Sequence, residues 1–234
     1  MTPTLTVPWP PADGRLVVVG TDTDVGKTVV SALLVQGLNA SYWKPVQCGD
    51  LAVGGDSGRV AGLTGLNRSS PTPPSLLPEA YRLAAPASPN QAARDEGIRV
   101  DDSRLDLPTV EGPLVVETAG GLLVPLRDDL LQIEQIKRWN LPVLLVARSG
   151  LGTLNHTLLS LEALAARQIP VLGLVLNGPL HPANRETLET VGGVPVLAEL
   201  TPQQELNREV LQQLWDHSAL GGTAEQLRAR GCSA

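Results

Sequence analysis

Several features that mark particular protein classes are missing from this 234-residue chain. It has only two cysteines, Cys48 and Cys232, too few for a disulfide framework and typical of a reducing compartment. No apolar run approaches the ~20 residues that a membrane-spanning helix needs. The N-terminal stretch MTPTLTVPWPPADG has neither the basic nor the apolar region of a secretory signal. We therefore expect a cytoplasmic protein without a membrane partner.

Positive charge is also scarce. The formal net charge is −6, and the arginines are scattered, so no basic surface is expected to attract nucleic acid. The histidines, His156, His181 and His217, show no metal-ligand spacing with one another or with cysteine, and we assign no zinc site.

Hydrophobic residues make up 42% of the chain, enough for a packed core. We expect one domain over residues 1–234, with an irregular lead-in at 1–14 and a helical C-terminal tail at 203–234. Residues 67–95 contain many prolines and little periodicity, and we expect a long excursion with one short helix there.

Short apolar, β-branched runs alternate with helical patterns along the chain. Helical spacing is clearest at 26–38 and 155–168. Strands are predicted at 15–20, 40–46, 113–118, 141–148, 170–177 and 194–200. This alternation predicts an α/β fold, a mostly parallel open sheet with helices on both faces, of the phosphate-loop nucleotide hydrolase type.

The stretch VVVGTDTDVGKT, residues 17–28, has the features of a phosphate-binding loop with irregular spacing. Gly20 lies one residue too early for the usual pattern, and Thr21 stands where the first glycine is expected. A Gly-Lys-Thr sequence directly after a strand still favours nucleotide binding. Lys27 would reach the phosphates, and the Thr28 hydroxyl would ligate Mg²⁺.

Further charged residues fit the same chemistry. The chain has only three lysines, and Lys44 lies at the end of a predicted strand, where open parallel sheets place ligands. Mg²⁺ prefers oxygen ligands, and Asp56 and Glu117 are the favoured carboxylates, with Asp22 and Asp24 as rivals. Asn177 ends another predicted strand, where its amide either reads a purine or simply forms a turn.

Taken together, these segments resemble dethiobiotin synthetases. The matching stretches are GTDTDVGKT, YWKPVQCG, GDSGRVAGLTG, PASPNQAA, VVETAGGLLVPL, ARSGLGTLNHTLLSLEAL and GLVLN, which span most of residues 15–200. The irregular phosphate loop is a trait of that family. The resemblance implies an ATP- and Mg²⁺-dependent ligase that joins CO₂ to 7,8-diaminopelargonic acid and closes a cyclic urea, through a carbamate and a carbamic-phosphoric anhydride. It also implies a homodimer with the substrate site at the interface.

The resemblance assigns roles to individual residues. Catalysis would rest on Lys27, Lys44 and Thr23, and Mg²⁺ would be held by Thr28, Asp56 and Glu117. Asn177 would contact adenine. ATP would be bound by Asp24, Val25, Gly26, Lys27, Thr28, Val29, Asp56, Glu117, Thr118, Ala119, Gly120, Asn177, Gly178, Thr201 and Pro202. The diamine substrate would be bound by Lys44, Cys48, Leu151, Gly152, Thr153 and Asn155, with its distal carboxylate at a helix N-terminus near Thr153.

Three positions depart from the pattern of that family. Cys48 stands where a serine or threonine is usual, and its thiol is a weak donor. Thr118 replaces a glycine, and a β-branched residue tolerates positive φ poorly. Thr201 and Pro202 differ in register from the usual nucleotide contact.

Other functions were weighed against this one. A partition-type ATPase switch acting through protein or membrane partners would usually carry a second lysine early in the phosphate loop, where this chain has TDTDV. A ligase linked to a glutamine amidotransferase would need a further domain with a nucleophilic cysteine. A non-catalytic binding module would require that Cys48 and Thr118 have disabled the site.

Overall fold

The computed structural model describes residues 3–68 and 72–222. Its centre is a six-stranded sheet with the strand order β10-β9-β8-β1-β5-β2, in which every neighbouring pair is parallel. The strands of this sheet are β1 (Arg15–Gly20), β2 (Ser41–Trp43), β5 (Leu114–Gly121), β8 (Val143–Arg148), β9 (Val171–Asn177) and β10 (Val196–Leu200). The predicted parallel α/β fold is confirmed.

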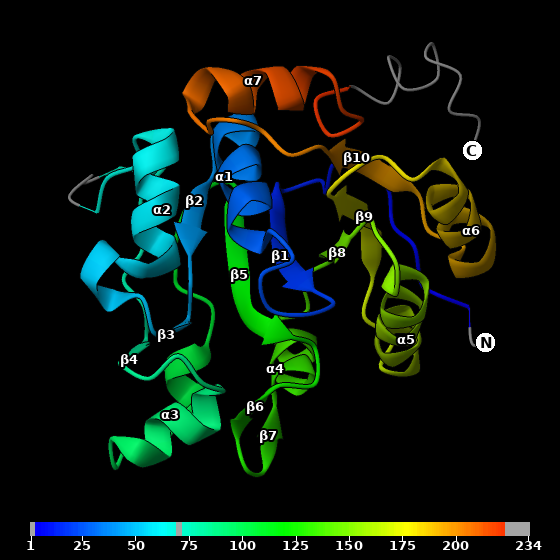
Figure 1. Cartoon of the computed structure of the whole chain (residues 1–234). Coiled ribbons are helices and arrows are strands. Elements are labelled where there is room, and N and C mark those ends of the chain that lie inside the picture. Colours follow the sequence, from blue (N-terminus) through cyan, green and yellow to red (C-terminus); the bar gives the residue numbers. More distant parts are fainter. Residues whose placement is uncertain (1–2, 69–71, 223–234) are drawn as a thin grey trace.

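Helices cover both faces of this sheet (Figure 1). One face packs against α1 (Lys27–Leu38), α2 (Gly55–Thr64) and α7 (Arg208–Asp216). The other face packs against α4 (Gln132–Trp139), α5 (Thr153–Ala166) and α6 (Pro182–Gly192). Along β1, Leu16 and Val18 belong to the first core and Val17 and Val19 to the second. This alternation explains why a strand buried on both faces is apolar at successive positions.

A smaller third core lies outside the central sheet. It is built from β3 (Val46–Cys48), β4 (Tyr81–Leu83), α3 (Pro89–Asp95) and the first strand of a hairpin formed by β6 (Pro125–Arg127) and β7 (Leu130–Leu131). Two short 3₁₀ helices, Leu51–Val53 and Asp102–Leu105, connect these elements. The expected excursion over residues 67–95 therefore contains β4 as well as the predicted short helix, which is α3.

One predicted strand is wrong in extent. The strand expected at 40–46 ends at Trp43, and β3 begins at Val46 in a different two-stranded sheet, paired with β4. Pro45 lies at the break and has no N–H to continue the ladder. This break matters for the site, because it turns the chain at Lys44.

The ends of the chain have less regular structure. Thr6 forms an isolated bridge with Val171, although no longer strand is found before β1 among the described residues. In the tail expected to be helical over 203–234, α7 is the one helix among the described residues, and residues 203–207 and 217–222 are not helical. Residues 223–234 lie outside the described residues. Within the described ranges, no helix is both long and apolar enough to cross a membrane.

Candidate active site

Because the six strands are parallel, their carboxyl ends share one edge of the sheet, and the predicted phosphate loop lies there between β1 and α1 (Figure 1). Two of its residues, Asp24 and Gly26, have left-handed backbones, with φ of 56° and 101°. A Cβ at Gly26 would come within 2.2 Å of Asn177 Nδ2. The second glycine of the motif is therefore required both by its dihedral angle and by a close neighbour.

Lys27 follows this glycine as the first residue of α1 and is buried. Its ammonium group donates to the backbone carbonyl of Asp22 at 2.8 Å, so the side chain folds back over the phosphate loop. Burial, and then the positive charge of Lys44, lower the pKa of Lys27 to about 8. Lys27 thus brings a second amine close to Lys44, and lysine ammonium groups suit phosphate and other anionic ligands.

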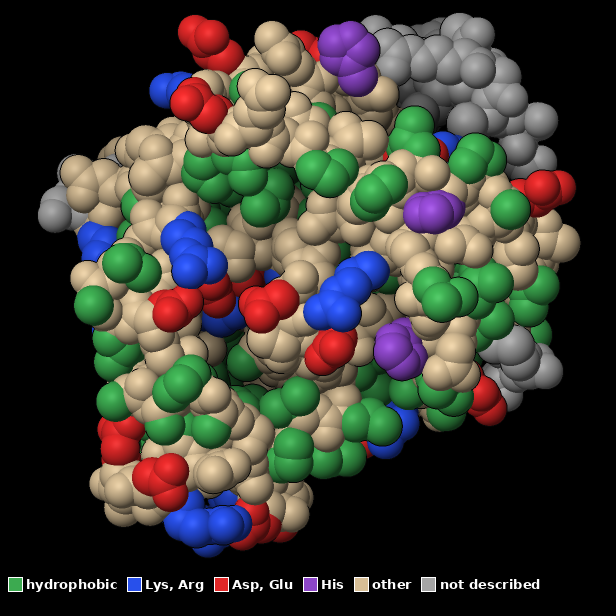
Figure 2. Space-filling model, viewed as in Figure 1, with side chains coloured by type: hydrophobic (Ala, Val, Ile, Leu, Met, Phe, Trp, Pro, Cys, Tyr) green, Lys and Arg blue, Asp and Glu red, His purple; other side chains and the backbone are tan. Residues whose placement is uncertain are grey.

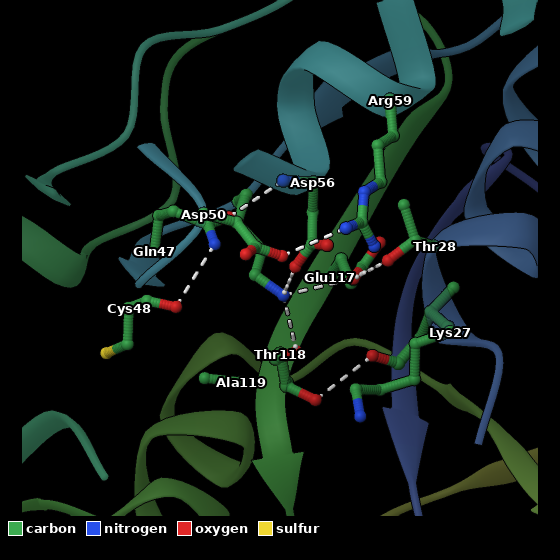
Figure 3. Close-up of polar contacts among 12 residues, drawn as sticks. Lys27, Thr28, Gln47, Cys48, Asp50, Asp56, Arg59, Glu117, Thr118 and Ala119 are labelled. Atoms are coloured by element: carbon green, nitrogen blue, oxygen red, sulfur yellow. Dashed lines mark hydrogen bonds and ion pairs between the residues drawn. The ribbon is translucent and has the colours of Figure 1, made fainter. Parts of the chain in front are cut away.

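Lys44 contacts Asp56, Glu117 and Thr118, which are labelled in the close-up of Figure 3. Its Nζ atom is 2.7 Å from Asp56 Oδ2 and 3.0 Å from Glu117 Oε1, and it donates to the Thr118 carbonyl at 3.1 Å. Burial disfavours the charged amine, but the carboxylates of Glu117 and Asp56 outweigh it, and the pKa of Lys44 is raised. Lys44 is therefore a permanent buried cation at neutral pH.

Thr28, Asp56 and Glu117, the three predicted metal ligands, come together around this cation. Thr28 Oγ1 donates to Glu117 Oε1 at 2.9 Å. Burial tends to raise the pKa of Asp56, but the charge of Lys44 and hydrogen bonds from Lys44 and Thr28 lower it overall. The result is a set of one hydroxyl and two carboxyl groups from three separate elements.

The donor chemistry of this set fits Mg²⁺. A hard cation takes oxygen ligands and usually completes its octahedron with phosphates and waters, so one hydroxyl and two carboxylates suffice. Among the described residues, no group of three or more His, Cys, Asp or Glu could hold a metal by itself. A metal at this site would therefore depend on a bound phosphate ligand for the rest of its coordination.

Gln47 was not identified from the sequence, yet it fixes one of these carboxylates. Its Oε1 accepts from the Asp56 backbone N–H at 2.9 Å, and its Nε2 donates to the Gly49 carbonyl at 3.1 Å. A Cβ at Gly55 would approach the Gln47 amide carbon to 2.6 Å. Gln47 thus holds the start of α2 in place, through contacts that no sequence motif indicates.

The predicted nucleotide contacts after the later strands also lie at this edge. Asn177 Nδ2 donates to the Val25 carbonyl at 3.0 Å, tying the end of β9 to the phosphate loop. The Gly178 N–H donates to the Leu200 carbonyl at 2.9 Å. This bond places the residue before Thr201 and Pro202 next to the residue that follows Asn177. Asn177 therefore has a structural partner, and its Oδ1 is the atom that could accept from an adenine.

Thr23 and the residues after Glu117 have partners that the sequence did not indicate. The exposed Arg148 donates to the Thr23 carbonyl at 3.2 Å. The Gln132 side-chain amide accepts from the Ala119 N–H at 3.0 Å and donates to its carbonyl at 2.7 Å. These contacts hold the phosphate loop at Thr23 and the last residues of β5 at Ala119. Figure 2 shows basic and acidic side chains gathered around a hollow in the middle of this face.

The expected substrate residues near α5 form a separate group. Gly152 is left-handed and precedes the helix, which begins at Thr153 as predicted. Leu151 and Asn155 are exposed, whereas the Thr153 side chain is buried and pairs with Thr157 at 3.2 Å. No hydrogen bond or ion pair joins this group to Lys44 within the described part of the chain. The contact of these residues with substrate stays a prediction.

Comparison with known proteins agrees with this geometry. A family model described as an AAA domain matches residues 14–210. The ATP-dependent dethiobiotin synthetase of Rhodopseudomonas palustris (strain BisB18) is 50% identical over 198 residues, covering 85% of this chain and 92% of the relative. That of Paramagnetospirillum magneticum is 51% identical over 185 residues, covering 79% and 86%. This chain belongs to the dethiobiotin synthetase family.

A solved structure supports the fold of this family member. The ParA family ATPase from Chlorobium tepidum TLS aligns with a TM-score of 0.50 over 95% of this chain and 93% of that chain. Sequence identity is 13%, so the likeness concerns the fold alone. The partition-type switch is not favoured as a function, because the close relatives are dethiobiotin synthetases.

Thr118, which departs from the family pattern, is accommodated without backbone strain. It is not among the residues with positive φ, whereas Gly120, two residues on, has φ of 58°. Its hydroxyl donates to the Val18 carbonyl at 3.1 Å. The threonine thus fits within β5, and the glycine that the turn requires is still present.

Cys48, the other departure close to the site, lies at the end of β3 and is half-buried. Burial raises the pKa of its thiol to about 11. The side chain is therefore a neutral thiol at physiological pH and not a nucleophilic thiolate. In this family member, the position offers a weak hydrogen-bond donor in place of a hydroxyl.

Proposed function

We propose that this chain makes dethiobiotin from 7,8-diaminopelargonic acid, CO₂ and ATP, with release of ADP and phosphate. The observation that carries this proposal is the buried Lys44 ammonium group, held by Asp56 and Glu117 beside the phosphate loop. A cation there can stabilise negative charge on a carbamate and on a transferring phosphoryl group. Membership of the dethiobiotin synthetase family supports the same reaction.

The proposed chemistry has three steps. One amine of the diamine adds to CO₂ and loses a proton, which gives a carbamate. A carbamate oxygen attacks the γ-phosphorus of ATP, ADP leaves, and a carbamic-phosphoric anhydride forms. The second amine then attacks the carbonyl carbon, the bond to the phosphate oxygen breaks, and the cyclic urea closes with loss of a proton.

The protein contributes position and charge to these steps. Lys27 would bind the phosphates, and Lys44 would contact the carbamate with Thr23 as a further hydrogen-bond partner. Thr28, Asp56 and Glu117 would hold Mg²⁺, which neutralises phosphate charge when bound. The rigid placement of Lys44 means that little reorganisation is needed when negative charge develops beside it.

The binding of ATP would use the phosphate loop and the neighbouring strand ends. Asp24, Val25, Gly26 and Val29 would surround the phosphates with Thr118, Ala119 and Gly120. Asn177, Gly178, Thr201 and Pro202 would surround the adenine. Asn177 is already held by the phosphate loop, which supports a shared nucleotide site.

The diamine site would be completed by a second copy of the chain. Lys44 and Cys48 would bind one part of the substrate. Leu151, Gly152, Thr153 and Asn155 of the other copy would bind the distal carboxylate at the N-terminus of α5. Leu151 is fully exposed in the single chain and is therefore accessible to a second copy.

A coupled assay tests the proposal. Phosphate release from ATP is measured with Mg²⁺ and bicarbonate, with and without 7,8-diaminopelargonic acid, and dethiobiotin is quantified in the same samples. We expect phosphate release to depend on the diamine and to equal the dethiobiotin formed. ATP hydrolysis that does not depend on the diamine would favour an ATPase switch instead. The absence of ATP hydrolysis would favour a disabled site.

A further inference from the structure

Tyr42 lies next to the site but has no place in the reaction described so far. It is the middle residue of β2, and its side chain is completely buried. On one side, the backbone of Tyr42 pairs with Val115 of β5. On the other side, it forms hydrogen bonds with Ser75 and Leu77. The ring therefore has little freedom to move, and its hydroxyl has a fixed position.

The Tyr42 hydroxyl donates to Glu117 Oε2 at 3.0 Å. The other carboxylate oxygen, Oε1, accepts from Thr28 Oγ1 at 2.9 Å and from Lys44 Nζ at 3.0 Å. The two oxygens of Glu117 thus have different partners. One faces the groups that bind nucleotide and substrate, while the other is held by a phenol that touches neither.

This division has a consequence for metal binding. When Mg²⁺ and ATP bind, the contacts at Oε1 must rearrange, because Thr28 and Glu117 are both expected ligands and Lys44 is needed by the carbamate. The Tyr42 hydrogen bond is on the opposite oxygen and can persist throughout.

We propose that Tyr42 is a positioning residue that holds the Glu117 carboxylate in its metal-binding orientation. The inference rests on the proposed function, since it assumes that Glu117 serves a Mg²⁺-nucleotide complex. Without the phenol, the buried Oε2 atom loses the donor that the structure gives it, and the carboxylate is free to rotate away from this orientation. The simpler possibility is that Tyr42 only fills the core.

The chain offers a matched control in Tyr81, its only other tyrosine. Tyr81 is also buried, and its hydroxyl accepts from the Asp101 backbone N–H at 2.8 Å in the smaller core, away from Glu117. The variants Tyr42→Phe and Tyr81→Phe each remove one buried, hydrogen-bonded hydroxyl. A purely structural role predicts similar effects of the two substitutions.

The first test titrates Mg²⁺ against nucleotide binding by calorimetry, with a non-hydrolysable ATP analogue. In Tyr42→Phe we expect about a fivefold rise in the Mg²⁺ concentration for half-saturation, with metal-free nucleotide binding unchanged. In turnover, kcat should fall while the KM for the diamine stays within twofold. Tyr81→Phe should match the wild type. Equal Mg²⁺ requirements in the two variants would overturn the inference, whether or not the wild type makes dethiobiotin.

A second test keeps the Tyr42 hydroxyl and so does not depend on the stability of the Tyr42→Phe variant. Protein labelled with 3-fluorotyrosine has two ¹⁹F resonances, and Tyr81→Phe assigns them by removing one. Adding Mg²⁺ with the ATP analogue should shift the Tyr42 resonance and leave that of Tyr81 in place, whereas the analogue with EDTA should shift neither. If the Tyr42 resonance does not shift while calorimetry shows that Mg²⁺ and the ATP analogue bind, the proposal is contradicted. A wild type that binds Mg²⁺-nucleotide but makes no dethiobiotin contradicts the proposed function instead.

Discussion

The Lys44 ammonium nitrogen lies 2.7 Å from Asp56 Oδ2, which joins the chain just after β2 to the first turn of α2. Both groups are largely withdrawn from water, with 4% and 20% of their side-chain surfaces exposed. A buried ion pair of this kind is strongly held in the free protein. For Lys44 to serve a substrate anion, a second cation must take over the carboxylates, which is the part that Mg²⁺ would play.

Replacing Lys44 with alanine should separate chemistry from nucleotide binding. Loss of a preorganised positive charge is expected to lower turnover by about 10²–10³-fold, while ATP binding changes much less. Stability should also fall, by about 3 kcal/mol, because Glu117 and Asp56 lose their buried partner. Dethiobiotin formation, calorimetric ATP binding and chemical denaturation measure the three effects.

The control for this substitution is Lys137→Ala, at an exposed lysine on α4. It removes the same charge and is expected to leave turnover, binding and stability near wild-type values. Undiminished turnover in a folded Lys44→Ala protein would refute the proposed role of Lys44.

Gly26→Ala should disturb the phosphate loop in two ways. The backbone φ of 101° strains any L-residue, and the added Cβ would lie 2.2 Å from Asn177 Nδ2. We expect a loss of about 1–3 kcal/mol in stability from strain and a drop of more than tenfold in ATP affinity, because the loop must move. Denaturant melts and nucleotide calorimetry give both values.

Gly112→Ala is the control that introduces backbone strain without a new close contact. Gly112 has a φ of 75°, and a Cβ there would meet nothing within 4 Å. This variant should lose stability but keep its ATP affinity. If the two alanine variants bind ATP equally well, the close approach of Asn177 to the loop has no role in nucleotide binding.

The low pKa of Lys27 predicts that nucleotide binding is linked to proton uptake. In the free protein this pKa is about 8, below the ordinary value of 10.5. Between these values the unfolded chain holds a proton that the folded chain has released, so this lysine makes stability rise with pH in that window. Phosphate anions favour the charged amine and should raise its pKa again when ATP binds.

Calorimetry of ATP binding in buffers of different ionisation enthalpy measures this uptake. At pH 8.5 the wild type should take up a substantial fraction of a proton. In Lys27→Arg, the guanidinium is already charged, and the uptake assigned to this position should vanish. Identical proton uptake in the two proteins would show that Lys27 is fully charged before ATP arrives.

The sequence predicts the central sheet well because its strands are buried on both faces. Such strands are continuous apolar runs, which are visible without any knowledge of the fold. Helix α2 was not predicted, since its sequence GDSGRVAGLT contains three glycines and little apolar periodicity. The strand predicted at 40–46 stops before Pro45, because proline has no N–H for the hydrogen bonds of the sheet.

The candidate site was predictable where charged residues follow strands. Lys44 directly follows β2, Lys27 and Thr28 begin the helix that follows β1, and Glu117 lies within the neighbouring strand β5. Parallel strands bring such residues to one end of the sheet. The partners that orient them were not predictable. Tyr42 and Arg148 act through contacts between segments far apart in the sequence. Gln47 acts through a hydrogen bond to Asp56, nine residues further along the chain, that no periodic pattern indicates.

Cys48 provides a test of the proposed substrate contact. The pKa of about 11 keeps the thiol neutral, and a neutral thiol is a weak donor. If this position faces the diamine, Cys48→Ser should supply a stronger hydrogen bond and lower the KM for the diamine by roughly two- to tenfold, with the KM for ATP unchanged. Cys48→Ala, which removes the donor altogether, should raise the KM for the diamine slightly or leave it as it is. Steady-state kinetics with each substrate varied in turn makes the comparison. Serine and alanine variants with the same KM for the diamine would place the substrate elsewhere, because a hydroxyl in contact with the diamine would change that KM.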